Sequence, residues 1–284
     1  MATPIQFVKM HGLGNDFVVV DCVSHPYNIE QLVNAAAFLC DRHFGIGGDG
    51  LILVMPSQHG DFRMRIINSD GSEPEMCGNG IRCFARYVYE HGLTDKTTFT
   101  VETLAGLIVP VLSLEEGRVS GVCVDMGEPR LQREQIPMNG PAGTVENEPL
   151  QVADQTFYVT AVSMGNPHAV IFVDDVDAFP VEQYGPLVET NPIFPRKTNV
   201  EFVQVDTPQH IKMRVWERGA GITLACGTGA CATLVAAVIT GHAERTATVE
   251  LPGGPLQITW SEADNRIYMT GPAEEVFSGT VQIA

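Results

Sequence analysis

The motif Cys-Gly-x-Gly occurs twice in the chain, at residues 77–80 and 226–229. The copies are 149 positions apart, and the same offset aligns Met64-Arg65 with Met213-Arg214. From Met64 onward, six of 29 aligned positions are identical without a gap, against about two expected from composition. The match predicts an internal duplication, in which each half folds through the same succession of elements and carries one motif cysteine.

The residues after each motif cysteine predict a helix. The first runs from Gly78 to His91, and Gly92 suits its end because glycine accepts the left-handed conformation. In the second copy, residues 222–241 carry no charge and have the length of a membrane span. Their glycines and threonines favour a buried helix instead. Another helix, Ile29–Arg42, is predicted after Asn28, whose side chain can cap its first turn.

Runs of β-branched and aromatic residues between turn residues predict strands, so that each half is mostly strand with one apolar helix. A helix without a polar face must be covered on all sides. We therefore predict an α/β (α+β) fold of two pseudo-symmetric halves, each a curved, mostly antiparallel sheet or open barrel wrapped around a central apolar helix, with the active site in the cleft between them. The predicted strands are 5–10, 17–21, 51–55, 62–68, 98–102, 107–112, 119–126, 157–163, 169–174, 200–205, 211–216, 246–251, 256–260 and 266–269.

The stretch 127–149 is rich in proline and glycine and has little periodicity, which is typical of a boundary. We assign residues 1–126 to an N-terminal half and residues 127–270 to a C-terminal half. The segment 271–284 is expected to return to the first half as a strand.

The net charge of −17 disfavours nucleic acid and anionic membrane surfaces as partners, but it does not oppose a small zwitterionic ligand. The first residues lack the basic and apolar regions of a signal peptide. Seven cysteines without framework spacing favour reduced thiols. These features predict a cytoplasmic enzyme with a small-molecule substrate.

A cysteine at a helix start has a chemical meaning, because first-turn amides and the helix dipole stabilise a thiolate. The amides of two such helix starts can also hold one carboxylate. With a thiol on either side of its α-carbon, an amino acid could lose a proton from one face and regain one on the other. The pattern therefore predicts racemisation or epimerisation.

No cofactor or metal is expected. None of the four lysines, Lys9, Lys96, Lys197 and Lys212, lies in a Gly/Ser-rich phosphate cup of the kind that accompanies pyridoxal phosphate. Cys226 and Cys231 lack a second cysteine pair or a histidine cluster that would complete a metal site.

Several motifs in order along the chain resemble the diaminopimelate epimerase family, which converts LL- to meso-diaminopimelate in lysine and peptidoglycan precursor biosynthesis. They lie at residues 9–17, 68–72, 76–80, 165–168, 198–201, 216–219 and 225–229. The resemblance implies a homodimer, although Phe277 stands where the family often has tyrosine at the dimer contact.

The resemblance also implies roles for individual residues. Cys77 and Cys226 would be the two acid/bases, and His168 with Glu217 would tune the pKa of the thiols. The first-turn amides would hold the reacting carboxylate, Asn68, Asn199 and Arg218 the distal carboxylate, and Glu217 the distal ammonium. The substrate-binding residues implied are Asn15, Asn68, Gly78, Asn79, Asn166, Asn199, Glu217, Arg218, Gly227 and Thr228.

Three alternatives remain open at this point. A proline-racemase-like enzyme would resemble Cys-Gly-His-Gly in the first motif, where this chain has Asn79. A thiol redox protein usually has a local Cys-x-x-Cys pair, which is absent from the sequence. The third alternative is a ligand-binding module without catalysis.

Overall fold

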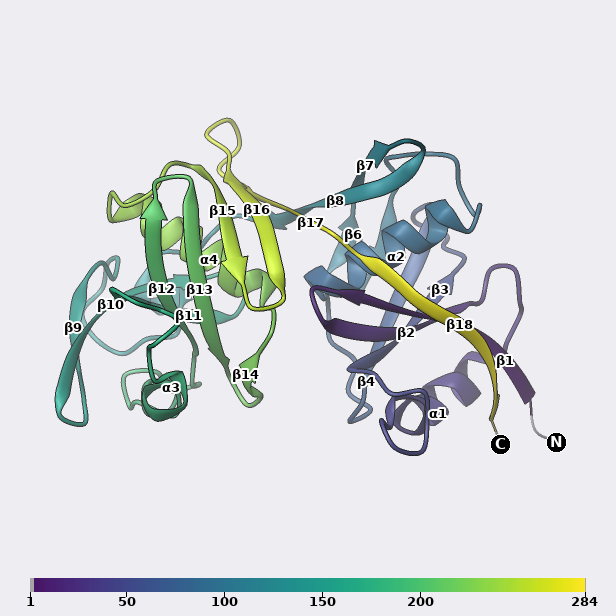
Figure 1. The fold of residues 1–284 in the computed structure, drawn as a ribbon, viewed down its shortest axis with the longest axis horizontal. Coiled ribbons are helices and arrows are strands. Elements are labelled where there is room, and N and C mark those ends of the chain that lie inside the picture. Colours follow the sequence, from purple (N-terminus) through teal and green to yellow (C-terminus); the bar gives the residue numbers. More distant parts are fainter. Residues whose placement is uncertain (1–2, 284) are drawn as a thin grey trace. The chain divides into compact units, whose positions relative to one another are not determined.

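The computed structural model describes residues 3–283, which form two compact units. The first unit extends to Val124 and takes back the C-terminal segment from Gly271, and the second comprises Asp125–Thr270. Figure 1 shows the chain coloured along its sequence. None of the described helices is long and apolar enough to cross a membrane.

The first unit is built on a seven-stranded sheet with the order β18-β1-β2-β3-β4-β5-β6. Neighbouring strands are antiparallel except for the pairs β2–β3 and β4–β5. The strands are β1 (Thr3–Gly12), β2 (Asn15–Asp21), β3 (Gly50–Met55), β4 (Phe62–Asn68), β5 (Val101–Thr103), β6 (Gly106–Ile108) and β18 (Glu274–Ile283). The C-terminal segment joins this sheet, since β18 pairs with β1 from Thr3 to His11.

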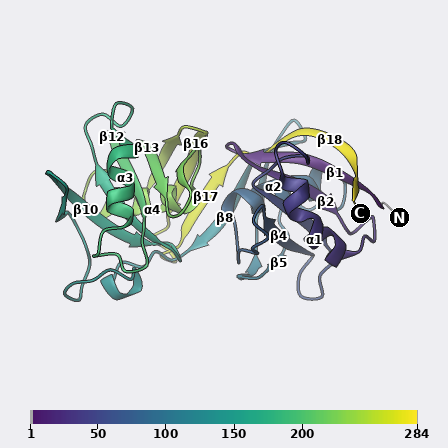
Figure 2. The same cartoon turned by 90° about the horizontal axis from the view of Figure 1, so that it is seen from below.

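Two helices, α1 (Ile29–Cys40) and α2 (Gly78–Glu90), pack on this sheet (Figures 1 and 2). The side chain of Leu51 joins the core cluster under α1, whereas Ile52 faces Gly80 at the start of α2. Successive residues of a strand point to opposite faces, so the two helices lie on opposite faces of the sheet.

The second unit has the strand order β9-β10-β11-β12-β13-β15-β16-β17, with β14 paired to β13. Only β11–β12 and β13–β15 are parallel among these described pairs. The hairpin of β7 (Val111–Glu115) and β8 (Arg118–Gly127) leads the chain into this unit. The elements after this hairpin are η1 (Arg133–Gln135), β9 (Glu148–Val152), β10 (Gln155–Ser163), β11 (Pro167–Phe172), α3 (Val181–Glu189), β12 (Asn199–Thr207), β13 (His210–Glu217), β14 (Gly221–Thr223), α4 (Gly227–Ile239), β15 (Thr246–Leu251), β16 (Gly254–Trp260) and β17 (Ile267–Gly271).

The predicted duplication is confirmed by the register of the elements. The helices α2 and α4 correspond at both ends with the offset of 149, and each is followed by a glycine with positive φ, Gly92 at 71° and Gly241 at 76°. The parallel pairs correspond too, since Phe17 lies opposite Gly50 and His168 opposite Asn199. The mixed, mostly antiparallel α+β architecture is also confirmed, as open sheets in the described chain.

The two central helices differ in polarity. Besides α2 and α4, the units contain α1, which was predicted, and α3, and Arg82 lies fully buried in α2. Only α4 has the expected apolar character, with buried side chains on all sides. Arg82 tolerates burial because its guanidinium donates to three oxygen atoms, of Pro272, Gly78 and Asn79.

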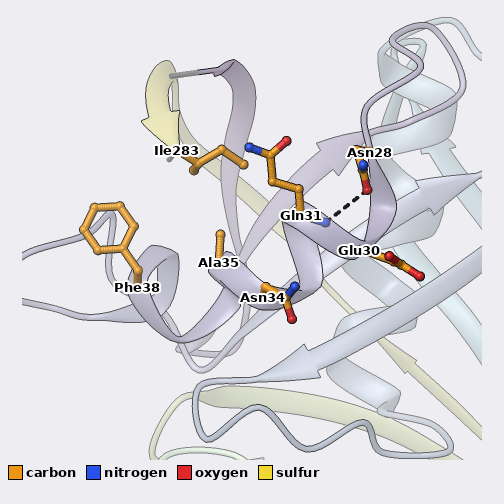
Figure 3. A pocket seen from close by; sticks show the side chains of 7 residues that line it. All are labelled: Asn28, Glu30, Gln31, Asn34, Ala35, Phe38 and Ile283. Carbon is orange, nitrogen blue, oxygen red and sulfur yellow. Dashed lines mark hydrogen bonds between the residues drawn. The ribbon is translucent and has the colours of Figure 1, made fainter. Parts of the chain in front are cut away.

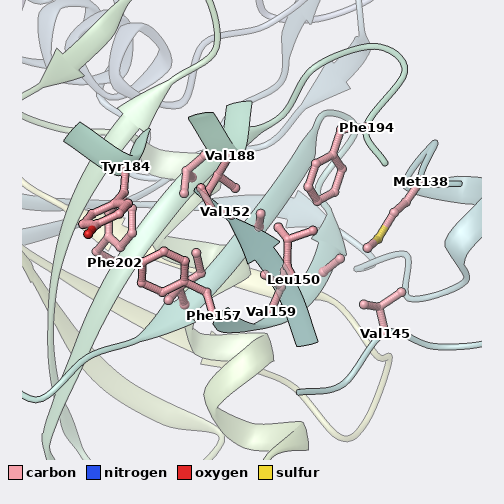
Figure 4. Close-up of a cluster of buried hydrophobic side chains, with 14 of the residues drawn as sticks. Met138, Val145, Leu150, Val152, Phe157, Val159, Tyr184, Val188, Phe194 and Phe202 are labelled. Carbon is pink, nitrogen blue, oxygen red and sulfur yellow. The ribbon is translucent and has the colours of Figure 1, made fainter. Parts of the chain in front are cut away.

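Two local features differ from the sequence-based prediction. The strand expected at 107–112 is split into β6 and β7, since Pro110 has no N–H to donate to a ladder. Helix α3 was not predicted. The sequence of α3 includes Gly185-Pro186, a pair that disfavours a helix, so only packing reveals it. Figure 4 shows that packing, with Tyr184 and Val188 of α3 in one buried cluster with Phe157 and Phe202.

Gly185 yields a prediction whose sign is opposite to helix propensity. Replacing a helical glycine by alanine normally stabilises a protein by about 1 kcal/mol. A Cβ at Gly185 would lie 2.7 Å from both Cβ and Cγ of Trp216, whose ring nitrogen is fixed by Glu189. We expect Gly185→Ala to lower the free energy of unfolding by about 1–2 kcal/mol, because overpacking outweighs propensity.

Urea unfolding checks this expectation, with Gln183→Ala as the matched control at an exposed position of the same helix. The control is expected to change stability by less than about 0.5 kcal/mol. A Gly185→Ala variant as stable as the control or more stable would show that Trp216 moves to accommodate the new Cβ without lowering the free energy of unfolding.

Candidate active site

Each motif cysteine is the N-cap of its helix. Cys77 and Cys226 have similar extended conformations, with φ/ψ of −140°/118° and −124°/104°. The sulfur of each accepts a hydrogen bond of 3.4 Å from the backbone N–H three residues later, at Gly80 and Gly229. The side-chain oxygen of serine or aspartate usually makes this bond. The arrangement therefore places both sulfur atoms where helix amides favour negative charge.

The surroundings of Cys77 are a chain of oriented amides. Its sulfur lies 3.8 Å from Oδ1 of Asn15, and the same oxygen accepts from Nδ2 of Asn79 at 3.1 Å. Oδ1 of Asn79 accepts in turn from Arg82 at 2.9 Å. Because arginine can only donate, it fixes which end of the Asn79 amide points to Asn15. Three of the predicted residues are thus brought together in the first unit.

An ion-pair network holds Asn15 from its other side. Nδ2 of Asn15 donates to Asp49 at 2.6 Å, and Arg42 bridges Asp49 and Asp16. Lys9, which is buried, pairs with Asp16 at 2.5 Å. Burial alone would raise the pKa of Asp16, but hydrogen bonds from Arg42 and Lys9 hold it well below its usual range. This network keeps the Asn15 amide oxygen directed at Cys77.

A longer chain of contacts leads to Cys226 in the second unit. The sulfur lies 3.6 Å from Oγ1 of Thr228, which accepts from Nδ2 of Asn166 at 3.3 Å. Oδ1 of Asn166 is 3.0 Å from Nε2 of His168. Nδ1 of His168 is 2.7 Å from Oε1 of Glu201, and both of these side chains are fully buried. Four predicted residues therefore lie in one connected group.

Burial raises the pKa of the Cys226 thiol well above its ordinary value, and the carboxylates of Glu217 and Glu201 raise it further. Hydrogen bonds from Thr228 and Gly229 act in the opposite direction but are weaker. The expectation that a helix start lowers the thiol pKa is therefore wrong for Cys226 in this structure, because desolvation of the thiolate outweighs the amides. Cys226 holds its proton at neutral pH.

Other cysteines lack this setting. Cys22, Cys40 and Cys83 are buried in apolar cores. Burial raises their pKa values to about 12, 11 and 12, respectively. Unlike Cys77 and Cys226, none of the three is the N-cap of a described helix, which fits a packing role.

The residues predicted to bind the distal end of a substrate form a separate set of contacts. Asn199 accepts from the backbone N–H of Arg218 at 2.9 Å and donates to the carbonyl of Pro167 at 2.9 Å. The Arg218 side chain is exposed, and its Nη1 donates to the carbonyl of Arg196 at 3.2 Å. Asn199 therefore positions the backbone beneath an accessible guanidinium.

Two further predicted residues occupy equivalent places in the repeat, 149 positions apart. Asn68 ends β4 and donates to Ser72 at 2.9 Å. Glu217 ends β13 and accepts a hydrogen bond from the Thr223 hydroxyl. Both lie at strand ends, where side chains can leave the sheet for a ligand.

The sequence-based reasoning missed Glu201. It named His168 and Glu217 as the residues that tune the thiols, and the structure pairs His168 with Glu201. A signal was present, because Glu201 interrupts an apolar strand run, Val200-Glu201-Phe202-Val203. A charged residue in such a run must be paired or protonated if the strand is buried.

A groove of about 520 Å³ lies on α1, away from these residues (Figure 3). The predicted cap of α1 at this groove is confirmed, since Asn28 accepts from the backbone N–H of Gln31 at 3.1 Å. None of the predicted site residues lines it. Its lining is Asn28, Glu30, Gln31, Asn34, Ala35, Phe38 and Ile283. In the described part of the chain, no cluster of three or more histidine, cysteine or acidic residues could hold a metal ion.

Comparison with known proteins gives the family. The diaminopimelate epimerase model matches residues 7–132 and 160–276. A protein of that name from Heliobacterium modesticaldum is 61% identical over 281 residues, covering 98% of this chain and all of its own length. Another from Pelotomaculum thermopropionicum is 59% identical over 275 residues, covering 97% and 98% of the two chains.

Solved structures of lower identity share the fold. A phenazine biosynthesis protein of the PhzF family from Bacillus anthracis has a TM-score of 0.74 at 19% identity, covering 98% of this chain and 99% of its own. A hydroxyproline epimerase from Agrobacterium vitis has a TM-score of 0.67 at 15% identity, covering 98% and 92%. With the match along nearly its whole length, the chain belongs to the diaminopimelate epimerase family of isomerases.

Proposed function

We propose that the chain interconverts LL- and meso-diaminopimelate without a cofactor, with Cys77 and Cys226 as the two acid/bases. The observation that carries the proposal is the equivalent N-cap position of the two cysteines. Relatives named diaminopimelate epimerase, at about 60% identity over nearly the whole chain, support the choice of substrate. A thiol redox function has no such support.

The proposed reaction balances as two proton transfers. One sulfur, as a thiolate, takes the α-proton, and the electron pair of the broken C–H bond spreads into the substrate carboxylate. The other sulfur, as a thiol, gives its proton to the opposite face of the α-carbon. The two cysteines therefore exchange protonation states in each turnover, and either the reverse reaction or proton exchange with water restores them.

The backbone amides supply most of the stabilisation in this scheme. A thiolate is a weak base for an amino-acid α-proton, so the carbanion must be stabilised rather than simply formed. Amides of Gly78, Asn79, Gly227 and Thr228 would bind the carboxylate as its charge grows. Removing one such donor typically costs about 3–4 kcal/mol of transition-state stabilisation.

The raised pKa of Cys226 fits this scheme if the substrate changes its environment. Glu217 raises that pKa through its negative charge. We propose that Glu217 binds the distal ammonium of diaminopimelate, which would neutralise this charge. The thiolate of Cys226 would then form more readily with substrate bound than in the free enzyme.

We further propose that the enzyme acts in the cytoplasm as a homodimer, in lysine and peptidoglycan precursor biosynthesis. The strand β18 lies at the edge of the sheet of the first unit and exposes Val276 and Phe277. Exposed edge strands with apolar side chains favour pairing with another chain. Phe277 is held in place by an edge contact with Phe7, with ring centroids 5.9 Å apart.

Deuterium incorporation tests the two-base mechanism. With LL-diaminopimelate in D2O at early conversion, the product is expected to carry deuterium at the inverted centre, while recovered substrate stays almost unlabelled. The reason is that the proton removed by one sulfur is not the one delivered by the other. NMR of the α-proton in both pools measures this. Equal early labelling of both pools would contradict the two-base mechanism.

Single cysteine variants complete this test. Cys77→Ala and Cys226→Ala are each expected to lose epimerisation by at least about 10³-fold, since neither sulfur can replace the other. Cys123→Ala, at a partly exposed position, is the control and should retain activity. Full activity in either motif variant would remove that cysteine from the reaction.

A second prediction concerns recognition of the distal carboxylate. Arg218→Lys is expected to lower kcat/KM for diaminopimelate about 10- to 100-fold, because an ammonium cannot reproduce the planar two-donor fork. Steady-state kinetics measure this, with the exposed Arg118→Lys as control. An unchanged kcat/KM in Arg218→Lys would exclude this role.

A further inference from the structure

Glu201 and His168 form a buried pair that the fold itself does not require. Both side chains have no exposed surface, and Oε2 of Glu201 is buried without a hydrogen-bond partner. Taking two ionisable groups out of water costs several kcal/mol unless geometry compensates. A fully buried pair with an unsatisfied oxygen therefore needs a reason other than stability.

The internal duplication provides the comparison that identifies this reason. The register of β11–β12 matches that of β2–β3, so that His168 corresponds to Phe17 and Glu201 to Ile52. Phe17 and Ile52 are buried apolar residues. The same positions in the same sheet are thus filled by hydrocarbon in the first unit, which shows that packing is satisfied without charge.

The carboxyl group of Glu201 lies against the helix start that carries Cys226. A Cβ at Gly229 would lie 2.8 Å from Oε1 of Glu201 and 3.1 Å from the Cys226 sulfur. Glycine at this position allows the close approach. In the first unit, the corresponding Gly80 faces the side chains of Ile66 and Ile52 instead.

Hydrogen-bond polarity runs in one direction along the chain from Glu201 to Cys226. Because Oδ1 of Asn166 only accepts, Nε2 of His168 must carry a proton. One further proton lies in the 2.7 Å contact between Nδ1 and Glu201, which makes the pair neutral as a unit. The Asn166 amide then donates to Thr228, whose hydroxyl lies 3.6 Å from the sulfur and is the donor of this contact when the sulfur is a thiolate.

We propose that Glu201 is a positioning residue that fixes the Nε2–H form of His168, and thereby directs the Thr228 hydroxyl to donate to Cys226 and stabilise its thiolate. The proposal rests on the proposed function in assigning Cys226 to the reaction. Without a partner on Nδ1, the proton of His168 could move to that nitrogen. Asn166 would then turn its amide, and Thr228 would donate to Asn166 rather than to sulfur.

Charged groups around Cys226 come from few elements. The strands packed on α4 are β10, β11, β12, β13, β15 and β16. Among them, β12 contributes Glu201 and β13 contributes Glu217 as carboxylates that act on the thiol, and β11 contributes His168. The carboxylate of Glu201 alone raises the pKa of Cys226, but the proton in its 2.7 Å contact with His168 offsets this charge. Loss of the pair therefore removes hydrogen-bond direction rather than net charge.

The pH dependence of Cys226 alkylation tests the proposal in the full-length protein. Iodoacetamide reacts with thiolate, and mass spectrometry of the Cys226 peptide reads this sulfur alone. Glu201→Ile, which introduces the residue of the first unit, is expected to raise the alkylation midpoint by about one pH unit, a tenfold loss of thiolate below it. Glu201→Gln is expected to keep the wild-type midpoint, because its amide N–H holds Nδ1 as acceptor.

The sign of the shift separates the possible outcomes. A lower midpoint in either variant would mean that Glu201 acts as an unneutralised charge, which overturns the proposal. An unchanged midpoint in Glu201→Ile, or an equal rise in Glu201→Gln, overturns it as well. The double variant His168→Phe/Glu201→Ile reproduces the pair found in the first unit, so it should fold with a wild-type Tm and still show the raised midpoint.

Epimerisation kinetics give an independent readout. Glu201→Ile is expected to lower kcat at least about tenfold with little change in KM, and Glu201→Gln to restore kcat to within about threefold. Equal kcat in wild type and Glu201→Ile would contradict a positioning role. If wild-type protein does not epimerise diaminopimelate, the proposed function fails. The alkylation profiles still decide whether Glu201 positions the hydrogen-bonded groups that lead to Cys226.

Discussion

The hydrogen bond from a first-turn backbone amide to a cysteine sulfur is the constraint around which each unit is arranged. A sulfur atom at an N-cap lies at the N-terminus of its helix, and the next residues must let the backbone approach it closely. Gly80 and Gly229 meet that need where each helix start touches a strand of its own sheet. These glycines therefore let β3 and β12 lie directly beneath the two helix starts.

Duplication produced two such helix starts, and divergence made their surroundings opposite in polarity. At Cys77 the side-chain amide of Asn15 presents an oxygen, and its orientation is fixed by Arg82, which can only donate, and by Asp49, whose carboxylate accepts. At Cys226 the contact is a hydroxyl that already accepts from Asn166. One sulfur faces an acceptor, and the other faces a hydroxyl that can donate. An enzyme that handles two stereochemically different centres has use for such unequal partners.

Much of this was accessible from the sequence because duplication repeats its signals. The motif cysteines located the starts of both helices, and alternating apolar runs located most strands. The hidden parts depend on contacts distant in sequence. Helix α3 contains Gly185-Pro186 and exists because Tyr184 and Val188 complete a core with Phe157 and Phe202. Burial of Arg82 depends on the carbonyl of Pro272, 190 residues away. The partner of His168 likewise depends on the parallel register of β11 and β12, which no local pattern encodes.

The closing strand of the first unit has a consequence for how the protein is made. Residue Thr3 pairs with Ile283, so β1 acquires its outer neighbour only after β18 has left the ribosome. At about 5–20 residues per second, the wait is on the order of tens of seconds. The second unit is continuous from Asp125 to Thr270 and is complete before that moment. Synthesis from the N-terminus therefore completes the second unit first, and the sheet of the N-terminal unit is the last to be completed.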